Sequence, residues 1–117
     1  MPKPSTPKES QKNTQTETQL ETQFWDLVDH FIQQANNACE ALEPGIVSAA
    51  LLNAAARFNA FVVASASLDR NEFIEEIEPA QQHLTERYRE LLSDNLEDYR
   101  EHYKVYIRSD NLSDERE

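Results

Sequence analysis

The apolar run at residues 46–64, IVSAALLNAAARFNAFVVA, constrains the fold of this chain more than any other feature of its sequence. Fifteen of its 19 residues are apolar, and at helical spacing they occupy nearly the whole circumference of a helix. A helix that is apolar all round must be buried on more than one side or lie in a membrane. At 1.5 Å per residue the run measures about 28 Å, which is close to the thickness of a bilayer core.

Three features of the run favour a buried helix over a membrane span. Arg57 lies past its middle, where insertion of an arginine costs roughly 2.5–3.5 kcal/mol. Asn53 and Asn59 add to that cost, and many of the apolar residues are alanine, which lets neighbouring helices approach closely. No cluster of lysine or arginine follows the run to anchor it at a membrane surface. We therefore predict no membrane association.

Composition argues against several classes of enzyme and binding protein. A dinucleotide fingerprint, a P-loop or a nucleophile elbow needs more than one glycine, and this chain has only Gly45. A β-sandwich or barrel needs turn residues roughly every 8–12 positions, and the sequence lacks them. The net charge of −11 argues against a surface that neutralises phosphates, so we expect no nucleic-acid partner.

The N-terminal segment and the single cysteine bear on localisation. Residues 1–18 hold three of the five prolines and almost no apolar side chains, which predicts a disordered tail. This segment lacks the apolar stretch of a signal peptide, and unlike a transit peptide it carries acids and no arginine. Cys39 has no second cysteine with which to form an internal disulfide, which is typical of a reducing compartment. We therefore expect a cytoplasmic protein.

Two helical segments are predicted on either side of the apolar run. The first covers residues 21–42, behind a capping box at Thr18–Glu21, and Glu43-Pro44-Gly45 ends it with the glycine in a tight turn. The second covers residues 69–107. With the apolar run, these segments predict an all-α fold, a small helical bundle of three main helices.

The sequence of residues 69–107 is compatible with two helical arrangements. Asp69–Glu72 is a second capping box at its start. The residues that follow form either one long bent helix or two or three consecutive helices, broken near Pro79 or Asp94. The helical domain is predicted over residues 19–107, and the charged residues 108–117 are predicted to fray.

Helix lengths point to self-association. A continuous helix over residues 69–107 would be about 58 Å long, against about 33 Å for the first helix, so it would overhang a three-helix bundle. Two amphipathic helices cannot cover the whole circumference of the apolar run. We therefore expect a two-fold dimer with the second helix near its interface. The alternative is a chain that breaks at Pro79 or Asp94 and wraps the apolar helix with three segments.

Arg57 is the most informative candidate for a site. Its apolar neighbours predict partial burial, and a buried guanidinium needs carboxylate or carbonyl partners. One interpretation is a buried ion pair with Asp26, Asp29 or Glu40 that fixes helix register or dimer geometry. The other is a polar pocket that binds a small anionic ligand, built from a set of four residues: Arg57, Asn59, Asn53 and Asp26.

Metal binding and catalysis have weaker support. His30 and His102 each follow an aspartate at i, i+4 spacing, but no histidine has the preceding glutamate of a helical di-iron centre. One cysteine gives no zinc framework, and no nucleophile–base pair stands out. We therefore expect no metal, no cofactor and no catalytic residue.

The residues from Val47 to Ala64 are distinctive enough to indicate a family. With Phe24-Trp25 before them and Asn95-Leu96 and Asp98-Tyr99 after them, the chain resembles a bacterial family of small acidic helical proteins, domain of unknown function 3144. The resemblance covers roughly residues 22–106. It implies a helical domain in a cytoplasmic bacterial protein, and the family brings no assigned activity, cofactor or site residue.

Two hypotheses about function follow from the sequence. The first is a non-enzymatic helical module that self-associates as a homodimer and binds another protein. The second is a binder of small anions, or an enzyme, with a polar pocket around Arg57 and Asn59.

Overall fold

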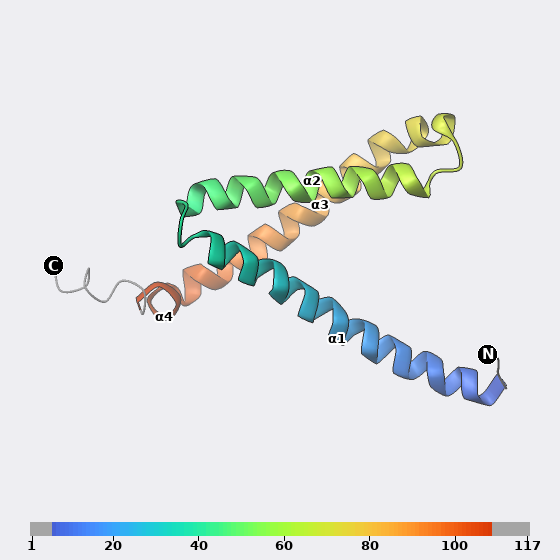
Figure 1. Ribbon diagram of the computed structural model, residues 1–117, viewed down its shortest axis with the longest axis horizontal. Helices are drawn as coiled ribbons and strands as arrows, with labels where there is room; N and C mark the ends of the chain where they lie inside the picture. Colours follow the sequence, from blue (N-terminus) through green and yellow to red (C-terminus); the bar gives the residue numbers. More distant parts are fainter. Residues whose placement is uncertain (1–5, 109–117) are drawn as a thin grey trace. The chain divides into compact units, whose positions relative to one another are not determined.

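The computed structural model describes the backbone of residues 6–108 and the side chains of residues 16–107. Within that range its regular elements are helices, three long ones and a short fourth (Figure 1), so the predicted all-α class is confirmed. The chain divides into two units, Met1–Phe58 and Asn59–Glu117. The boundary falls inside the second helix, and each unit is described by itself.

The first unit begins with α1, Thr6–Ala38. The helix starts well before the predicted residue Glu21, so Thr18 lies inside α1 and the prediction that it caps a helix start is wrong. The lysine, glutamate and glutamine residues before Thr18 are good helix formers and carry the helix further towards the N-terminus. The tail predicted over residues 1–18 therefore overlaps α1 from Thr6 onward, and residues 1–5 lie outside the described range.

The turn into α2, Pro44–Ala66, differs from the prediction. α1 ends at Ala38, and the backbone N–H of Leu42 donates to the Ala38 carbonyl at 2.9 Å. Pro44 takes the first helical position, where a missing N–H costs nothing. Gly45 therefore lies in the first turn of α2 without a positive φ, and the prediction that it makes the tight turn is wrong.

Burial in the first unit is slight. Phe24, Val28, Ala35 and Ala38 recur at helical spacing as an apolar stripe along α1, on which Val28, Ala35 and Ala38 are half-buried. Phe24 on the same stripe is 56% exposed. Val47 near the start of α2, at 8% exposed, is the one buried apolar residue among the described residues. A core this small contributes little to stability, because hydrophobic stabilisation scales with the apolar area removed from water.

The second unit holds the rest of α2, then α3, Arg70–Glu101, and α4, Tyr103–Arg108. The predicted cap of α3 is confirmed: Asp69 Oδ1 accepts from the backbone N–H of Glu72 at 2.9 Å. The Glu72 carboxylate in turn accepts from the backbone N–H of Leu68. The two side chains thereby satisfy two amides at the entry to the helix.

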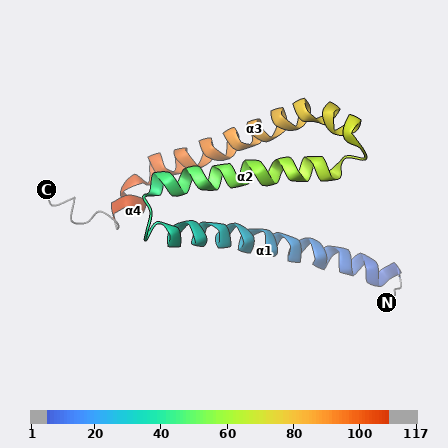
Figure 2. The same ribbon diagram turned by 45° about the horizontal axis from the view of Figure 1, so that its top comes forward.

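α3 resolves the choice that the sequence leaves open. The helix runs through Pro79 and Asp94 without a break, and Figure 2 shows it as one gently curved coil. Pro79 removes one helical N–H, so the Glu75 carbonyl loses its usual donor and a bend becomes easier. The chain leaves the helix at His102, whose N–H still donates to the Asp98 carbonyl at 3.0 Å.

Gly45 provides a test of the α1–α2 boundary. A Cβ built at this residue meets no neighbouring atom within 4 Å, so Gly45→Ala should stabilise the fold by roughly 0.5–1 kcal/mol. The reverse change at Ala55 within α2, Ala55→Gly, should destabilise it by a similar amount. Urea unfolding followed by circular dichroism at one protein concentration measures both. A loss of stability in Gly45→Ala would instead place Gly45 in the turn.

Candidate functional site

The surface of α2 is the most unusual feature of the described chain. Six of its large apolar side chains are between 41% and 63% exposed, although the helix carries a single charged residue, Arg57. These exposed side chains are Ile46, Leu51, Leu52, Phe58, Phe61 and Val62. At about 100° per residue they leave the helix in several directions, so no single side of α2 is polar enough to face water favourably.

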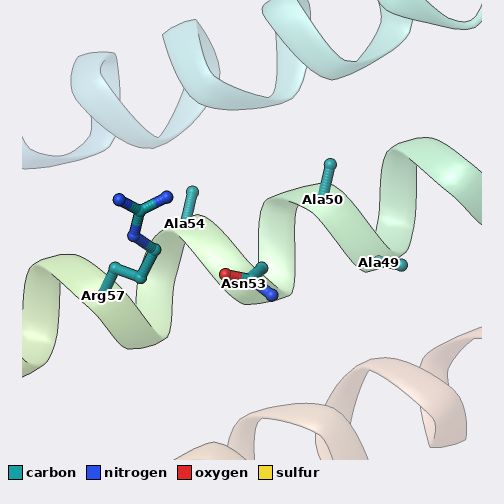
Figure 3. Close-up of a pocket in the computed structure, with 5 residues that line it drawn as sticks. All are labelled: Ala49, Ala50, Asn53, Ala54 and Arg57. Carbon is teal, nitrogen blue, oxygen red and sulfur yellow. The ribbon is translucent and has the colours of Figure 1, made fainter.

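A shallow hollow lies on one side of this helix. All five of its lining residues belong to α2, and Figure 3 shows Arg57 extending from the helix on the same side as Ala54 and Ala50. The complete lining is Ala49, Ala50, Asn53, Ala54 and Arg57. The alanines leave room beside the longer Arg57 and Asn53 side chains. The sequence contained the signal for this hollow in the spacing of its alanines, but only Asn53 and Arg57 were predicted as site residues.

The four predicted site residues divide into two groups. Asn53 and Arg57, one helical turn apart, line the hollow together. Asn59 lies two residues after Arg57 and therefore leaves the other side of α2. Asp26 belongs to α1 and is not part of the lining.

Arg57 itself differs from the prediction of partial burial. The residue is exposed, and in the part of the chain with described side chains no ion pair or hydrogen bond reaches it. The predicted pair with Asp26, Asp29 or Glu40 is therefore not formed within one chain. The physical reason is the open surface of α2: the guanidinium keeps its contact with water, so nothing forces it onto a carboxylate.

The shape of the hollow limits what it can hold. Sites for small molecules bury roughly 70–90% of their ligand, and one helix surface cannot enclose a ligand to that extent. An amino-acid side chain from another helix needs no such enclosure, because the backbone of that helix holds the side chain in position. The five N–H donors of Arg57 suit a carbonyl or carboxylate group on the approaching surface.

A second polar cluster joins α3 to α4. The Tyr106 hydroxyl donates to Asp98 Oδ2 at 2.8 Å, and His102 Nδ1 lies 3.2 Å from Asp98 Oδ1. The rings of Tyr99 and Tyr106 pack against each other with centroids 4.7 Å apart and planes tilted by 42°. The i, i+4 spacing predicts the pairing of Asp98 with His102, and Tyr106 shares the same helical face at i+8. The cluster holds α4 across the break at His102.

Asp98 also perturbs the acid–base chemistry of this cluster. Its hydrogen bond to the hydroxyl, and then its negative charge, raise the pKa of Tyr106 above the usual value for tyrosine. The other histidines, His30 and His83, are exposed. Among the described residues no three His, Cys, Asp or Glu side chains gather as metal ligands.

α2 is also long and apolar enough to cross a membrane, judged by length and composition alone. It is the one such helix in the described part of the chain. Arg57 weighs against a span, and the absence of membrane association stays a prediction.

Comparison with known proteins places the chain in a family. The model of the family described as "Protein of unknown function (DUF3144)" matches residues 24–100. This confirms the predicted resemblance. Searches of the curated proteins and of the solved structures found no match to the chain.

The Asp98–Tyr106 hydrogen bond gives a prediction about pH. Because the folded chain raises the pKa of Tyr106, the bond stabilises the junction fully below the ordinary tyrosine pKa, and this contribution is lost as pH rises through the raised pKa. Asp98→Asn should lower the pKa of Tyr106 towards its ordinary value. Ultraviolet absorbance titration, with Tyr106→Phe as the reference, measures it. An unchanged titration curve in Asp98→Asn would show that the bond does not form.

Proposed function

The chain belongs to the DUF3144 family, and on that premise we propose that it is a non-enzymatic helical module that self-associates and binds another protein. The observation that carries the proposal is the contrast in exposure: Val47 is buried, whereas Trp25, Phe58 and Phe61 are each more than half exposed. Exposed apolar surface on this scale marks an interaction site in a soluble protein.

Folding energetics support the proposal. Isolated helices are marginal in water, and most helical stability in proteins comes from packing of an apolar face. Ordering each residue costs about 1–2 kcal/mol of conformational entropy, which burial of one valine cannot offset. A second molecule that covers α2 supplies the missing burial.

α3 supports the proposal that the chain also binds another protein. Its own apolar side chains remain exposed, including Tyr88 at 50% and Leu96 at 60%. Because α2 and α3 each carry uncovered apolar surface, one contact between two copies need not use both. We assign the remaining surface to a protein partner.

The cellular setting belongs to the proposal as well. Cys39 is an exposed free thiol, which suits a reducing compartment such as the bacterial cytoplasm. The bacterial source is part of the same proposal and is supported by the family resemblance alone. The alternative, a pocket for a small anion at Arg57 and Asn59, has less support, because the two side chains leave different sides of α2.

Light scattering coupled to gel filtration tests the proposal. Purified protein at micromolar concentration should elute with twice the monomer mass of 13.5 kDa. A strict monomer with a helical circular dichroism spectrum would rule out self-association. A thermal-shift screen against anionic metabolites tests the alternative: a ligand that stabilises the wild type but not Arg57→Lys would favour a binding pocket.

A further inference from the structure

We propose that the junction of α3 and α4 is a hinge with two states: the Asp98 carboxylate holds the chain bent, and its release lets α3 continue as one straight helix through α4. The residues of this α3–α4 hinge are Asp98, Tyr99, His102 and Tyr106. Figure 1 shows α4 turned nearly end-on where α3 ends. The inference concerns the second unit alone and does not depend on the proposed self-association.

The sequence around the bend contains no helix breaker. Neither glycine nor proline occurs between Asp98 and Tyr106, and Arg100 and Lys104 are good helix formers. His102 nevertheless has a φ of −124° and a ψ of 34°, outside the α-helical region. Contacts between side chains, rather than local propensity, therefore hold the chain bent.

The bend costs three backbone hydrogen bonds. In an α-helix each N–H donates to the carbonyl four residues earlier, so a turn at His102 breaks the bonds of the three amides that follow it. Within residues 6–108, none of these three amides donates to a carbonyl of α3: Tyr103, Lys104 and Val105. The helical bonds on either side remain, from the N–H of His102 and from that of Tyr106, both at 3.0 Å. All three residues are exposed, so water takes the place of the lost carbonyls and the cost is small.

Two contacts of Tyr106 offset this cost and require the bend. Its hydroxyl donates to Asp98 at 2.8 Å, and its ring centroid lies 4.7 Å from that of Tyr99. In a straight helix Tyr106 would lie about 12 Å beyond Asp98 and about 10.5 Å beyond Tyr99 along the axis. Helical side chains lean towards the N-terminus, so Asp98 and Tyr99 would both lean away from Tyr106. The straight helix therefore loses both contacts.

Asp98 is the group that decides between the two states. Its Oδ2 accepts from Tyr106, while its Oδ1 lies 3.2 Å from His102 Nδ1. The His102 contact has i, i+4 spacing, which a straight helix also allows, so the Tyr106 bond alone distinguishes the bent state. The neighbouring cation Arg100 pairs with Glu97 and leaves the Asp98 carboxylate to the hinge.

Opening of the hinge changes the surface that α3 presents. A straight helix from Arg70 to Arg108 would be about 58 Å long. Side chains spaced three and four apart would then form one apolar row along its last turns: Leu96, Tyr99, Tyr103 and Tyr106. In the bent state Tyr106 leaves this row and packs on Tyr99. The α3–α4 hinge thus sets how far the apolar row extends.

Nuclear magnetic resonance of the full chain tests the hinge with two independent signals. The wild type should show an Overhauser cross-peak between the rings of Tyr99 and Tyr106, and rapid hydrogen exchange at the three unbonded amides. Asp98→Ala should weaken the cross-peak and slow the exchange. The ratio of straight to bent chains should rise about tenfold, the effect expected of one hydrogen bond to a charged group.

Glu101→Ala is the matched control. It removes an acid from the same turn of α3, and among the described side chains no hydrogen bond or ion pair involves Glu101. Both signals should therefore stay close to those of the wild type. An equal effect of Glu101→Ala and Asp98→Ala would assign the change to charge or helix propensity and overturn the role of Asp98.

A double-mutant cycle tests whether Asp98 acts through the tyrosine hydroxyl. Tyr106→Phe keeps the ring and should also favour the straight state, but it should add little to Asp98→Ala because the bond is already gone. Additive effects of the two changes would contradict this coupling.

The remaining outcomes each overturn the proposal. A wild type without the ring cross-peak and with slow exchange at the three amides would show that α3 already runs straight. Asp98→Ala with both signals unchanged would show that Asp98 does not hold the bend. Loss of the cross-peak without slower exchange would show that α4 unfolds instead of joining α3.

Discussion

The apolar circumference of α2 is the constraint on which the rest of the structure depends. A helix with one charged residue and exposed leucine and phenylalanine side chains is not stable in water without a cover. The described part of the chain buries Val47 and leaves most of this surface open. Stability and function therefore have the same source in this account, because the contact that covers α2 also makes the protein an interaction module.

The interactions within the chain are mainly local. The Asp69 cap, the Arg100–Glu97 ion pair at 2.5 Å and the Asp98–Tyr106 bond each join residues within eight positions of one another. Such contacts fix where helices begin and end, and exposed ones contribute little to the free energy of folding. Apart from the Asp98–Tyr106 bond, which joins α4 to α3, these contacts act within one helix or at its start.

The features that could be predicted from the sequence are those that depend on local interactions. The start of α3 at Asp69 and the extent of α2 follow from capping chemistry and hydrophobic pattern, both of which are local. Gly45 lies in the helix and not in the turn, because Pro44, its neighbour, begins the helix one residue earlier. The exposure of Arg57 could not be predicted, since burial depends on what covers α2 rather than on α2 itself. The hollow depends on the spacing of its alanines, which the sequence shows, and on where the Asn53 and Arg57 side chains extend, which it does not.

If α2 is buried between copies of the chain, as we propose, folding and association are coupled. The most direct test is the midpoint of thermal unfolding, followed by circular dichroism over a hundredfold range of protein concentration. Coupled folding and association predicts a midpoint that rises steadily with concentration, because mass action favours the associated state. A midpoint that stays constant over the whole range would contradict the account, since it would show that a single chain covers α2 by itself.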